Sequence, residues 1–120
     1  MDTLQNKIDF INALNLDERI NHWQDLILLS NKYLNSENIN DSQSLKIINC
    51  FNGIRISRFI DSDIDIKLLD ISLLVARKLE NQNIILKGIL NDILYYSNYY
   101  PEKYNKLGLE KEIKKLNETI

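Results

Sequence analysis

The chain has few residues that break or cross-link a backbone. Its 120 residues include one cysteine, one proline and three glycines. So few glycines and prolines argue against a loop-rich β-sheet protein or a disordered chain, and helices are left as the expected elements. One cysteine cannot form a disulfide within the chain. We therefore expect Cys50 to be a small buried side chain in a reducing, cytoplasmic environment.

The sequence lacks the motifs that are typical of several functional classes. The single histidine excludes sites built on histidine pairs, and no glycine-rich phosphate loop or nucleophile elbow is visible. We expect a protein that is not an enzyme and that has no cofactor and no metal site. A net charge of -2 without a basic stripe argues against nucleic-acid binding. No apolar run approaches the ~18 residues of a membrane span, and we expect neither a membrane segment nor a secretory signal.

Apolar residues recur at spacings of three and four along most of the chain, which predicts helices. The predicted segments are about Thr3–Leu14, Leu16 or Asp17 to Leu34, Leu45–Ile60, Ile64–Leu79, Ile84–Asn98 and Leu109–Asn117. Between the second and third, residues 35–42 read as a loop because short amide and hydroxyl side chains compete for backbone hydrogen bonds.

The segment from about Ile64 to Leu79 carries apolar side chains around most of its helical wheel, as a buried helix does. We therefore predict an all-α fold, an irregular bundle of five or six antiparallel helices around this buried central helix. A chain of this length fits one domain over residues 1–120. The similar spacing of the three middle segments leaves a stack of repeated helices as the alternative arrangement.

Polar residues predict where two of the helices begin. Asn15 and Glu18 form the pattern of a capping box, in which each side chain binds the backbone amide of the other. Asp41 or Ser42 is the predicted cap of the third helix.

Glycine and proline mark four further positions. Gly53 and Gly88 lie inside predicted helices, which indicates close packing against another backbone, or a kink. Pro101 is expected to open a short turn or helix, and Gly108 to end it.

Three aspartates, Asp61, Asp63 and Asp65, alternate at the start of the predicted central helix. They resemble the opening of a calcium-binding EF-hand loop, but Ile66 and Ser72 stand where that loop needs glycine and glutamate. A second interpretation is that acids favour the positive end of a helix dipole. A third is a small acidic patch that attracts a basic partner.

Five of the six tyrosines fall in one stretch: Tyr95, Tyr96, Tyr99, Tyr100 and Tyr104. Helical spacing places Tyr95 with Tyr99 on one face and Tyr96 with Tyr100 on the adjacent face. They cannot all be buried. The cluster is either the edge of a core with its phenols in solvent or a protein-binding surface, since tyrosine is enriched at binding hot spots.

The C-terminal fifth of the chain resembles the small helical immunity proteins that neutralise colicin-type nucleases. Tyr99-Tyr100-Pro101, followed by the charged stretch from Glu110 to Lys115, is similar to the Tyr-Tyr-Pro segment and terminal helix of that family. The resemblance implies that Tyr99 and Tyr100 insert into a toxin, while acidic residues on a neighbouring helix add specificity. The rest of the chain departs from the family pattern, and Asp61, Asp63 and Asp65 are the candidates for a comparable part.

These observations predict a non-catalytic, cytoplasmic protein of the immunity or antitoxin type, which blocks a bacterial toxin domain with a basic surface. The predicted partner-binding residues are Tyr96, Tyr99, Tyr100, Tyr104, Asp61, Asp63 and Asp65. The chain itself is expected to be a monomer or a weak homo-oligomer. The alternative is a structural or regulatory helical module that self-associates, or a phage-encoded inhibitor, with the tyrosines or the last helix at its interface.

Overall fold

The chain folds into helices joined by turns. The structure, a computed structural model, describes residues 2–56, 61–80 and 83–119. These residues contain no strand, which confirms the predicted all-α fold. The chain divides into two compact units, unit 1 over residues 1–79 and unit 2 over residues 80–120. The expectation of a single domain stays a prediction.

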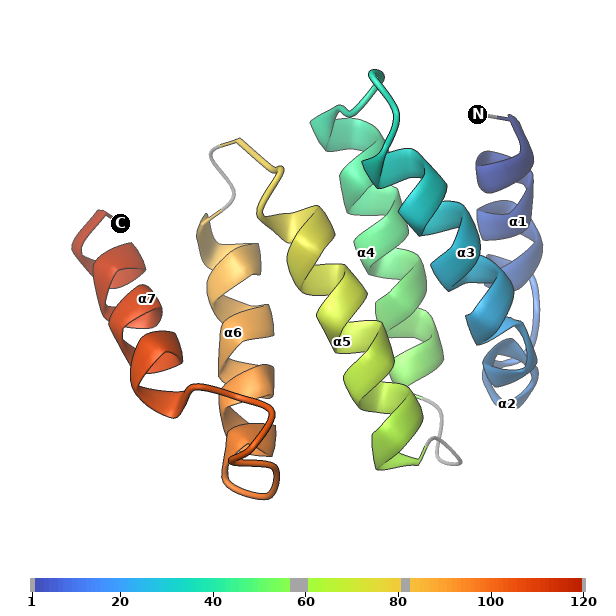
Figure 1. Ribbon diagram of the computed structural model, residues 1–120. Helices are drawn as coiled ribbons and strands as arrows, with labels where there is room; N and C mark the ends of the chain where they lie inside the picture. Colours follow the sequence, from blue (N-terminus) through green and yellow to red (C-terminus); the bar gives the residue numbers. More distant parts are fainter. Residues whose placement is uncertain (1, 57–60, 81–82, 120) are drawn as a thin grey trace. The chain divides into compact units, whose positions relative to one another are not determined.

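Helix α4 is the element on which unit 1 is assembled. The elements of this unit are α1 (Asp2–Asn12), α2 (Leu16–Arg19), the 3-10 turn η1 (Ile20–His22), α3 (Trp23–Leu34), α4 (Asp41–Arg55) and α5 (Ser62–Ala76) (Figure 1). Helix α4 packs against α1, α2, α3 and α5. Its Ile47, Phe51 and Ile54 follow at spacings of four and three and are 0% exposed. Residues 57–60, predicted to continue this helix, lie outside the described residues.

Helix α5 packs against α3 and α4 through one face. It begins two residues before its predicted start at Ile64 and ends three residues before its predicted end at Leu79. Leu69 and Val75 are fully buried, whereas Leu74 is 46% exposed. The apolar residues of this helix therefore fill the core on one side, and on the other side they are partly exposed to solvent.

The prediction of one continuous helix up to Leu34 is wrong, because the chain leaves the α-helical path at η1. Arg19, the last residue of α2, turns back toward the end of α1. Its Nε donates a hydrogen bond to the carbonyl of Leu14 (3.1 Å) and its Nη2 to the carbonyl of Asn12 (3.0 Å). At His22 the backbone has φ -114° and ψ 11°, outside the helical range. The Arg19 side chain reaches back five and seven residues, beyond the spacing of three and four that helical periodicity reports.

The start of α2 agrees with its prediction, but its cap does not. The helix begins at Leu16, one of the two expected positions. The Asn15 side chain makes no capping hydrogen bond, so the predicted capping box with Glu18 is wrong. Instead the Glu18 amide donates to the Asn15 carbonyl at 3.0 Å, a backbone contact that closes the first turn.

Asn40 caps α4, in place of the predicted Asp41 or Ser42. Its side-chain oxygen accepts a hydrogen bond from the Gln43 amide at 2.9 Å. The buried hydroxyl of Tyr33 donates to the Asn40 carbonyl (2.9 Å) and accepts from its amide (3.0 Å). These two bonds hold the end of the loop against α3, which places the Asn40 side chain over the first turn of α4.

Unit 2 is built from helices α6 (Asn83–Ser97) and α7 (Lys106–Thr119), which pack against each other (Figure 1). Helix α6 begins and ends within one residue of its predicted bounds. Its buried apolar residues are Ile89, Leu90 and Ile93. Ile93 lies three residues after Leu90 and four after Ile89, so all three are on one side of the helix, as the sequence pattern predicts.

The three glycines play different parts from those expected. A Cβ atom at Gly53 would lie 2.7 Å from Nη1 of Arg19, so the close neighbour is a side chain and not a backbone. A Cβ at Gly88 would meet nothing within 4 Å, and the predicted close approach there is wrong. Gly108 does not end a helix, because Asn105 accepts a hydrogen bond from its amide (3.1 Å) at the start of α7.

Candidate functional site

A tight turn at the end of α6 gathers the tyrosines. The Ser97 hydroxyl donates to the carbonyl of Leu94 at 2.5 Å, one turn back along the helix. The amides of Tyr99 and Tyr100 then both donate to the carbonyl of Tyr96, each at 2.9 Å. The chain therefore keeps a helix-like curvature for three residues beyond α6, and the tyrosine side chains stay in register with those on the helix.

The rings lie against one another in the pairs that helical spacing predicts. The ring centroids of Tyr95 and Tyr99 are 5.3 Å apart, and those of Tyr96 and Tyr100 are 6.4 Å apart. A third contact, edge to face at 5.5 Å, joins Tyr95 to Tyr96. Such aromatic pairs contribute about 0.5–1.5 kcal/mol each beyond their area. We call the five rings, including Tyr104, the tyrosine surface.

Two rings of the tyrosine surface are largely exposed. Tyr95 is 58% exposed and Tyr99 is 65% exposed, while the other three are partly buried. The ammonium group of Lys103 lies 5.4 Å from the centroid of the Tyr104 ring, a cation–π contact. The surface therefore combines rigid apolar area, phenolic hydroxyls and one cation.

The two exposed phenols are also electrostatically linked. The pKa of Tyr95 is raised above its ordinary value of 10.0, first by its hydrogen bond with Tyr99 and then by the charge that Tyr99 would carry. Ionising Tyr95 would remove a proton from the shared hydrogen bond and, once Tyr99 is also ionised, would place two like charges together. Tyr95 is therefore neutral at physiological pH and presents a hydroxyl able to bond a partner.

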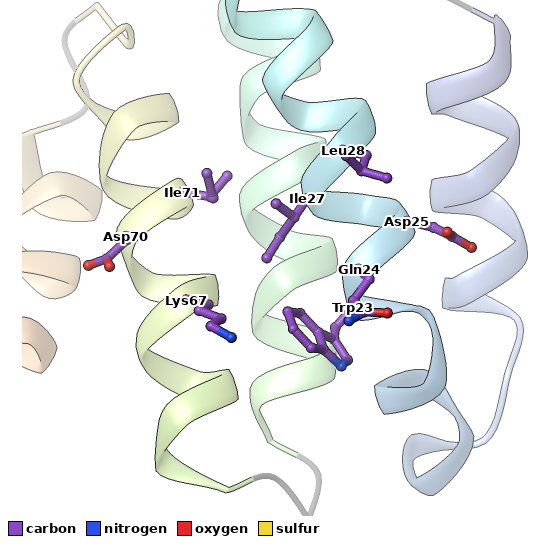
Figure 2. Close-up of a pocket in the computed structure, with 8 residues that line it drawn as sticks. All are labelled: Trp23, Gln24, Asp25, Ile27, Leu28, Lys67, Asp70 and Ile71. Carbon is purple, nitrogen blue, oxygen red and sulfur yellow. The ribbon is translucent and has the colours of Figure 1, made fainter.

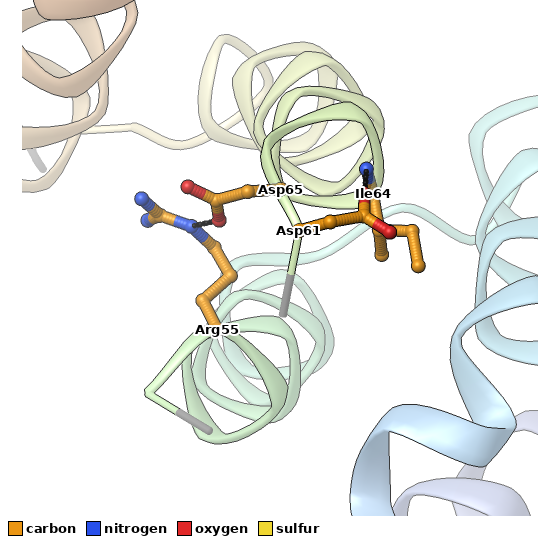
Figure 3. A network of polar contacts seen from close by, with 4 residues as sticks. All are labelled: Arg55, Asp61, Ile64 and Asp65. Atoms are coloured by element: carbon orange, nitrogen blue, oxygen red, sulfur yellow. Dashed lines mark hydrogen bonds and ion pairs between the residues drawn. The ribbon is translucent and has the colours of Figure 1, made fainter. Parts of the chain in front are cut away.

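The three candidate aspartates at the start of α5 have separate roles, and Figure 3 shows two of them, Asp61 and Asp65. Asp61 is the N-cap, and its carboxylate accepts from the Ile64 amide at 2.9 Å. Asp65 is only 9% exposed and binds Nε of Arg55 at 2.5 Å. Asp63 is exposed in the first turn. The helix-dipole and acidic-patch interpretations both stay predictions, and of the three only Asp61 and Asp63 leave acidic surface for a partner.

The structure brings the tyrosines together within unit 2, whereas the three aspartates belong to unit 1. In the described part of the chain, no three histidine, cysteine or acidic side chains are grouped so that they could hold a metal ion. None of the described helices is both long and apolar enough to cross a membrane.

Sequence reasoning missed a groove between α3 and α5, with a volume of about 580 Å³ (Figure 2). Its lining residues are Trp23, Gln24, Asp25, Ile27 and Leu28 from α3 and Lys67, Asp70 and Ile71 from α5. The ammonium group of Lys67 lies 5.3 Å from the ring of Trp23. The run of four apolar residues at 26–29 could have indicated this groove. One helix face cannot bury four consecutive side chains, so part of such a run stays at the surface.

Cys50, the one cysteine, is buried in unit 1 as predicted. Burial raises the pKa of its thiol to about 11, and the nearby Arg19 guanidinium lowers it by a smaller amount. A thiol with such a pKa is almost entirely protonated at neutral pH and is a poor nucleophile.

Neither a protein-family model, nor a curated protein, nor a solved structure matches this chain.

Proposed function

We propose that this chain is a non-catalytic binding protein of the toxin-immunity type, which neutralises a bacterial toxin by covering part of its surface. The observation that carries the proposal is the exposed, mutually packed pair Tyr95 and Tyr99 at the end of α6. Two large rings left in water are unfavourable for a protein without a partner, because their apolar area stays hydrated.

The arrangement suits binding because the rings are already ordered. A tyrosine has two side-chain torsions, and the ring contacts of Tyr95 with Tyr99 and with Tyr96 restrict them further. Little conformational entropy is then lost when a partner docks. The hydroxyls supply hydrogen bonds at the edge of an apolar contact, the combination found at interface hot spots.

The resemblance to the colicin-type immunity proteins supplies the class of partner. Tyr99 and Tyr100 stand at the positions that this resemblance assigns to anchoring tyrosines, followed by Pro101. Tyr96 and Tyr104 flank them on the tyrosine surface. Asp61 and Asp63 add negative charge on unit 1 that would steer a basic toxin domain.

The test starts from a pull-down in the source organism with three tagged baits. They are the wild-type chain, a Tyr99→Ala/Tyr100→Ala variant and a control with Leu16→Ala/Ile56→Ala, which truncates two exposed apolar residues of unit 1. The expected result is one stoichiometric protein that the tyrosine variant loses and the control keeps. By calorimetry, each tyrosine change should cost about 2 kcal/mol or more of binding free energy.

The captured protein then decides between immunity and other binding roles. When it is expressed alone it should arrest growth, and co-expression of the wild-type chain should restore growth. A captured protein that is harmless to cells would refute the immunity role. Equal affinities for the wild-type chain and the double variant would remove the tyrosine surface from the interface.

A further inference from the structure

Helix α3 carries an exposed apolar ridge between two grooves. The first is the groove of about 580 Å³ against α5 (Figure 2), and the second, of about 610 Å³, lies against α1 and is lined by Phe10, Leu29 and Lys32 among others. Leu28 and Asp25 border both grooves. Leu28 is 63% exposed and Phe10 is 50% exposed, so this face carries large apolar side chains in water.

Charges flank the ridge in a particular order. Asp25, near the start of α3, and Lys32, near its end, are both exposed. They are seven residues apart, which places them on the same side of the helix and about 10 Å apart along its axis. Leu28 and Leu29 stand midway between them. Along α3 this face therefore has a negative residue first, two apolar residues next and a positive residue last.

We propose that this face binds the same face of a second copy of the chain, with the two α3 helices antiparallel across a two-fold axis. The axis passes between Leu28 and Leu29, which brings Leu28 of each copy to Leu29 of the other. The same rotation places Asp25 of each copy opposite Lys32 of the other, twice in the dimer.

The order of charges along α3 fits a second copy, because an antiparallel copy of the helix presents a positive group to Asp25 and a negative group to Lys32. A parallel arrangement would place Asp25 against Asp25 and Lys32 against Lys32, which is repulsive. Lys7 binds the Asp25 carboxylate at 3.1 Å from the α1 side, but the Asp25 side chain is still 62% exposed and can accept a second cation. The ridge residue Leu28 has a groove on each side of its helix, so the ridge of one copy can enter a groove of the other.

Apolar contact supplies most of the association in this dimer, and the charge pairs set its orientation, since exposed ion pairs contribute little free energy. The proposal does not depend on the toxin-immunity function, because it uses unit 1 alone and none of the tyrosine surface.

The experiment measures the oligomeric state of the full chain by sedimentation velocity from 1 µM to 1 mM, a range chosen for an interface that is expected to be weak. The wild-type chain should show a monomer–dimer equilibrium. Asp25→Lys alone and Lys32→Asp alone should each weaken the dimer at least tenfold, because each creates two like-charge contacts. Leu28→Lys should weaken it further, since it places a charge beside the axis, against the apolar Leu29 of the other copy.

Charge exchange gives the decisive comparison. A one-to-one mixture of the Asp25→Lys and Lys32→Asp variants should form a heterodimer, because every contact is again between opposite charges. The chain that carries both changes should dimerise with itself. Asp17→Lys and Lys46→Asp, at exposed positions of α2 and α4, serve as controls with the same charge changes and should leave the dimer unaffected. Recovery on mixing also shows that both variants are folded.

Three outcomes would overturn the proposal. One is a wild-type chain that stays monomeric up to 1 mM. Another is a dimer that survives both single charge reversals, or that Tyr99→Ala/Tyr100→Ala abolishes, since the interface then lies elsewhere. The third is a monomeric chain whose captured partner binds less tightly to the Leu28→Lys variant, which would assign the face to that partner.

Discussion

The two units of this chain bury apolar side chains to different extents. Unit 1 holds a core in which residues such as Ile11, Leu26 and Phe51 are 0% exposed. Among the described residues of unit 2, the buried apolar side chains are Ile89, Leu90 and Ile93. Unit 2 also exposes Ile84 (74%), Leu107 (70%) and two tyrosine rings. The larger unit therefore carries most of the core, and the smaller carries the tyrosine surface that we propose for binding a toxin.

The difference concerns stability as well as location. A segment of 41 residues buries a smaller fraction of its surface than one of 79, so it gains less from the hydrophobic effect. We expect unit 2 to open at a lower free energy than unit 1, as regions with few buried contacts do. Trp23 reports on unit 1, and five of the six tyrosines report on unit 2.

The largest expected effect is the loss of stability when a buried core residue of either unit is truncated. Phe51→Ala should lower the free energy of unfolding of unit 1 by about 3–5 kcal/mol, and Leu90→Ala should lower that of unit 2 by about 2–5 kcal/mol, because each empties a fully buried site. Urea unfolding, followed by Trp23 fluorescence and by tyrosine near-ultraviolet circular dichroism, should show each variant shifting mainly its own signal. Ile54→Val is the milder change if Phe51→Ala does not fold. Identical shifts of both signals in every variant would show that the units unfold as one.

A second prediction compares two ion pairs of unit 1 whose carboxylates differ in exposure. Asp65→Ala should destabilise by about 3 kcal/mol, because it removes the carboxylate that binds the largely buried guanidinium of Arg55. Asp25→Ala removes a carboxylate whose side chain is 62% exposed, so it should cost at most about 1 kcal/mol, although its partner Lys7 is only 20% exposed. Chemical denaturation at low and high salt measures both. An Arg55→Met/Asp65→Leu chain should recover most of the loss, and equal costs for the two single changes would refute the distinction.

A third prediction uses one glycine from each unit. Gly53→Ala should change the stability of unit 1 by less than about 0.5 kcal/mol, because the gain in helix propensity is offset when its Cβ displaces the Arg19 guanidinium from the carbonyls that it binds. Gly88→Ala should stabilise unit 2 by about 0.5–1 kcal/mol, because alanine favours the helix and meets no neighbour. Thermal unfolding followed by circular dichroism gives the sign of each change. A loss of stability in Gly88→Ala would show that this helix face is covered.

The smallest expected effect concerns the tyrosine surface itself. The pKa of Tyr95 should lie above 10.0 and should fall toward that ordinary value in a Tyr99→Phe chain, which removes both the hydrogen bond and the neighbouring phenolate. Nuclear magnetic resonance titration of ring-labelled tyrosine, with Tyr95→Phe to assign the resonance, measures the change. A pKa of Tyr95 that does not respond to Tyr99→Phe would show that the two rings do not share a hydrogen bond in solution.

The sequence pattern predicted correctly those features that depend on a single helix. The bounds of α6 and the pairing of Tyr95 with Tyr99 follow from a repeat of 3.6 residues per turn, and both were predicted correctly. The burial of Cys50 among apolar neighbours was predicted for the same reason. The partner-binding role of the tyrosines stays a prediction, because exposure shows only that the rings are accessible.

Contacts between segments decided the rest. The chain leaves the α-helix at η1, next to the Arg19 side chain that binds carbonyls of the preceding segment. Asp65 is withdrawn from the surface and binds Arg55 of α4. Sequence alone determined that the chain is helical, where α6 lies and which side of it carries the tyrosines, since those properties arise within about four residues of backbone. Only the tertiary structure decided which charges are buried and where the grooves beside α3 lie, since these depend on side chains brought together from distant positions.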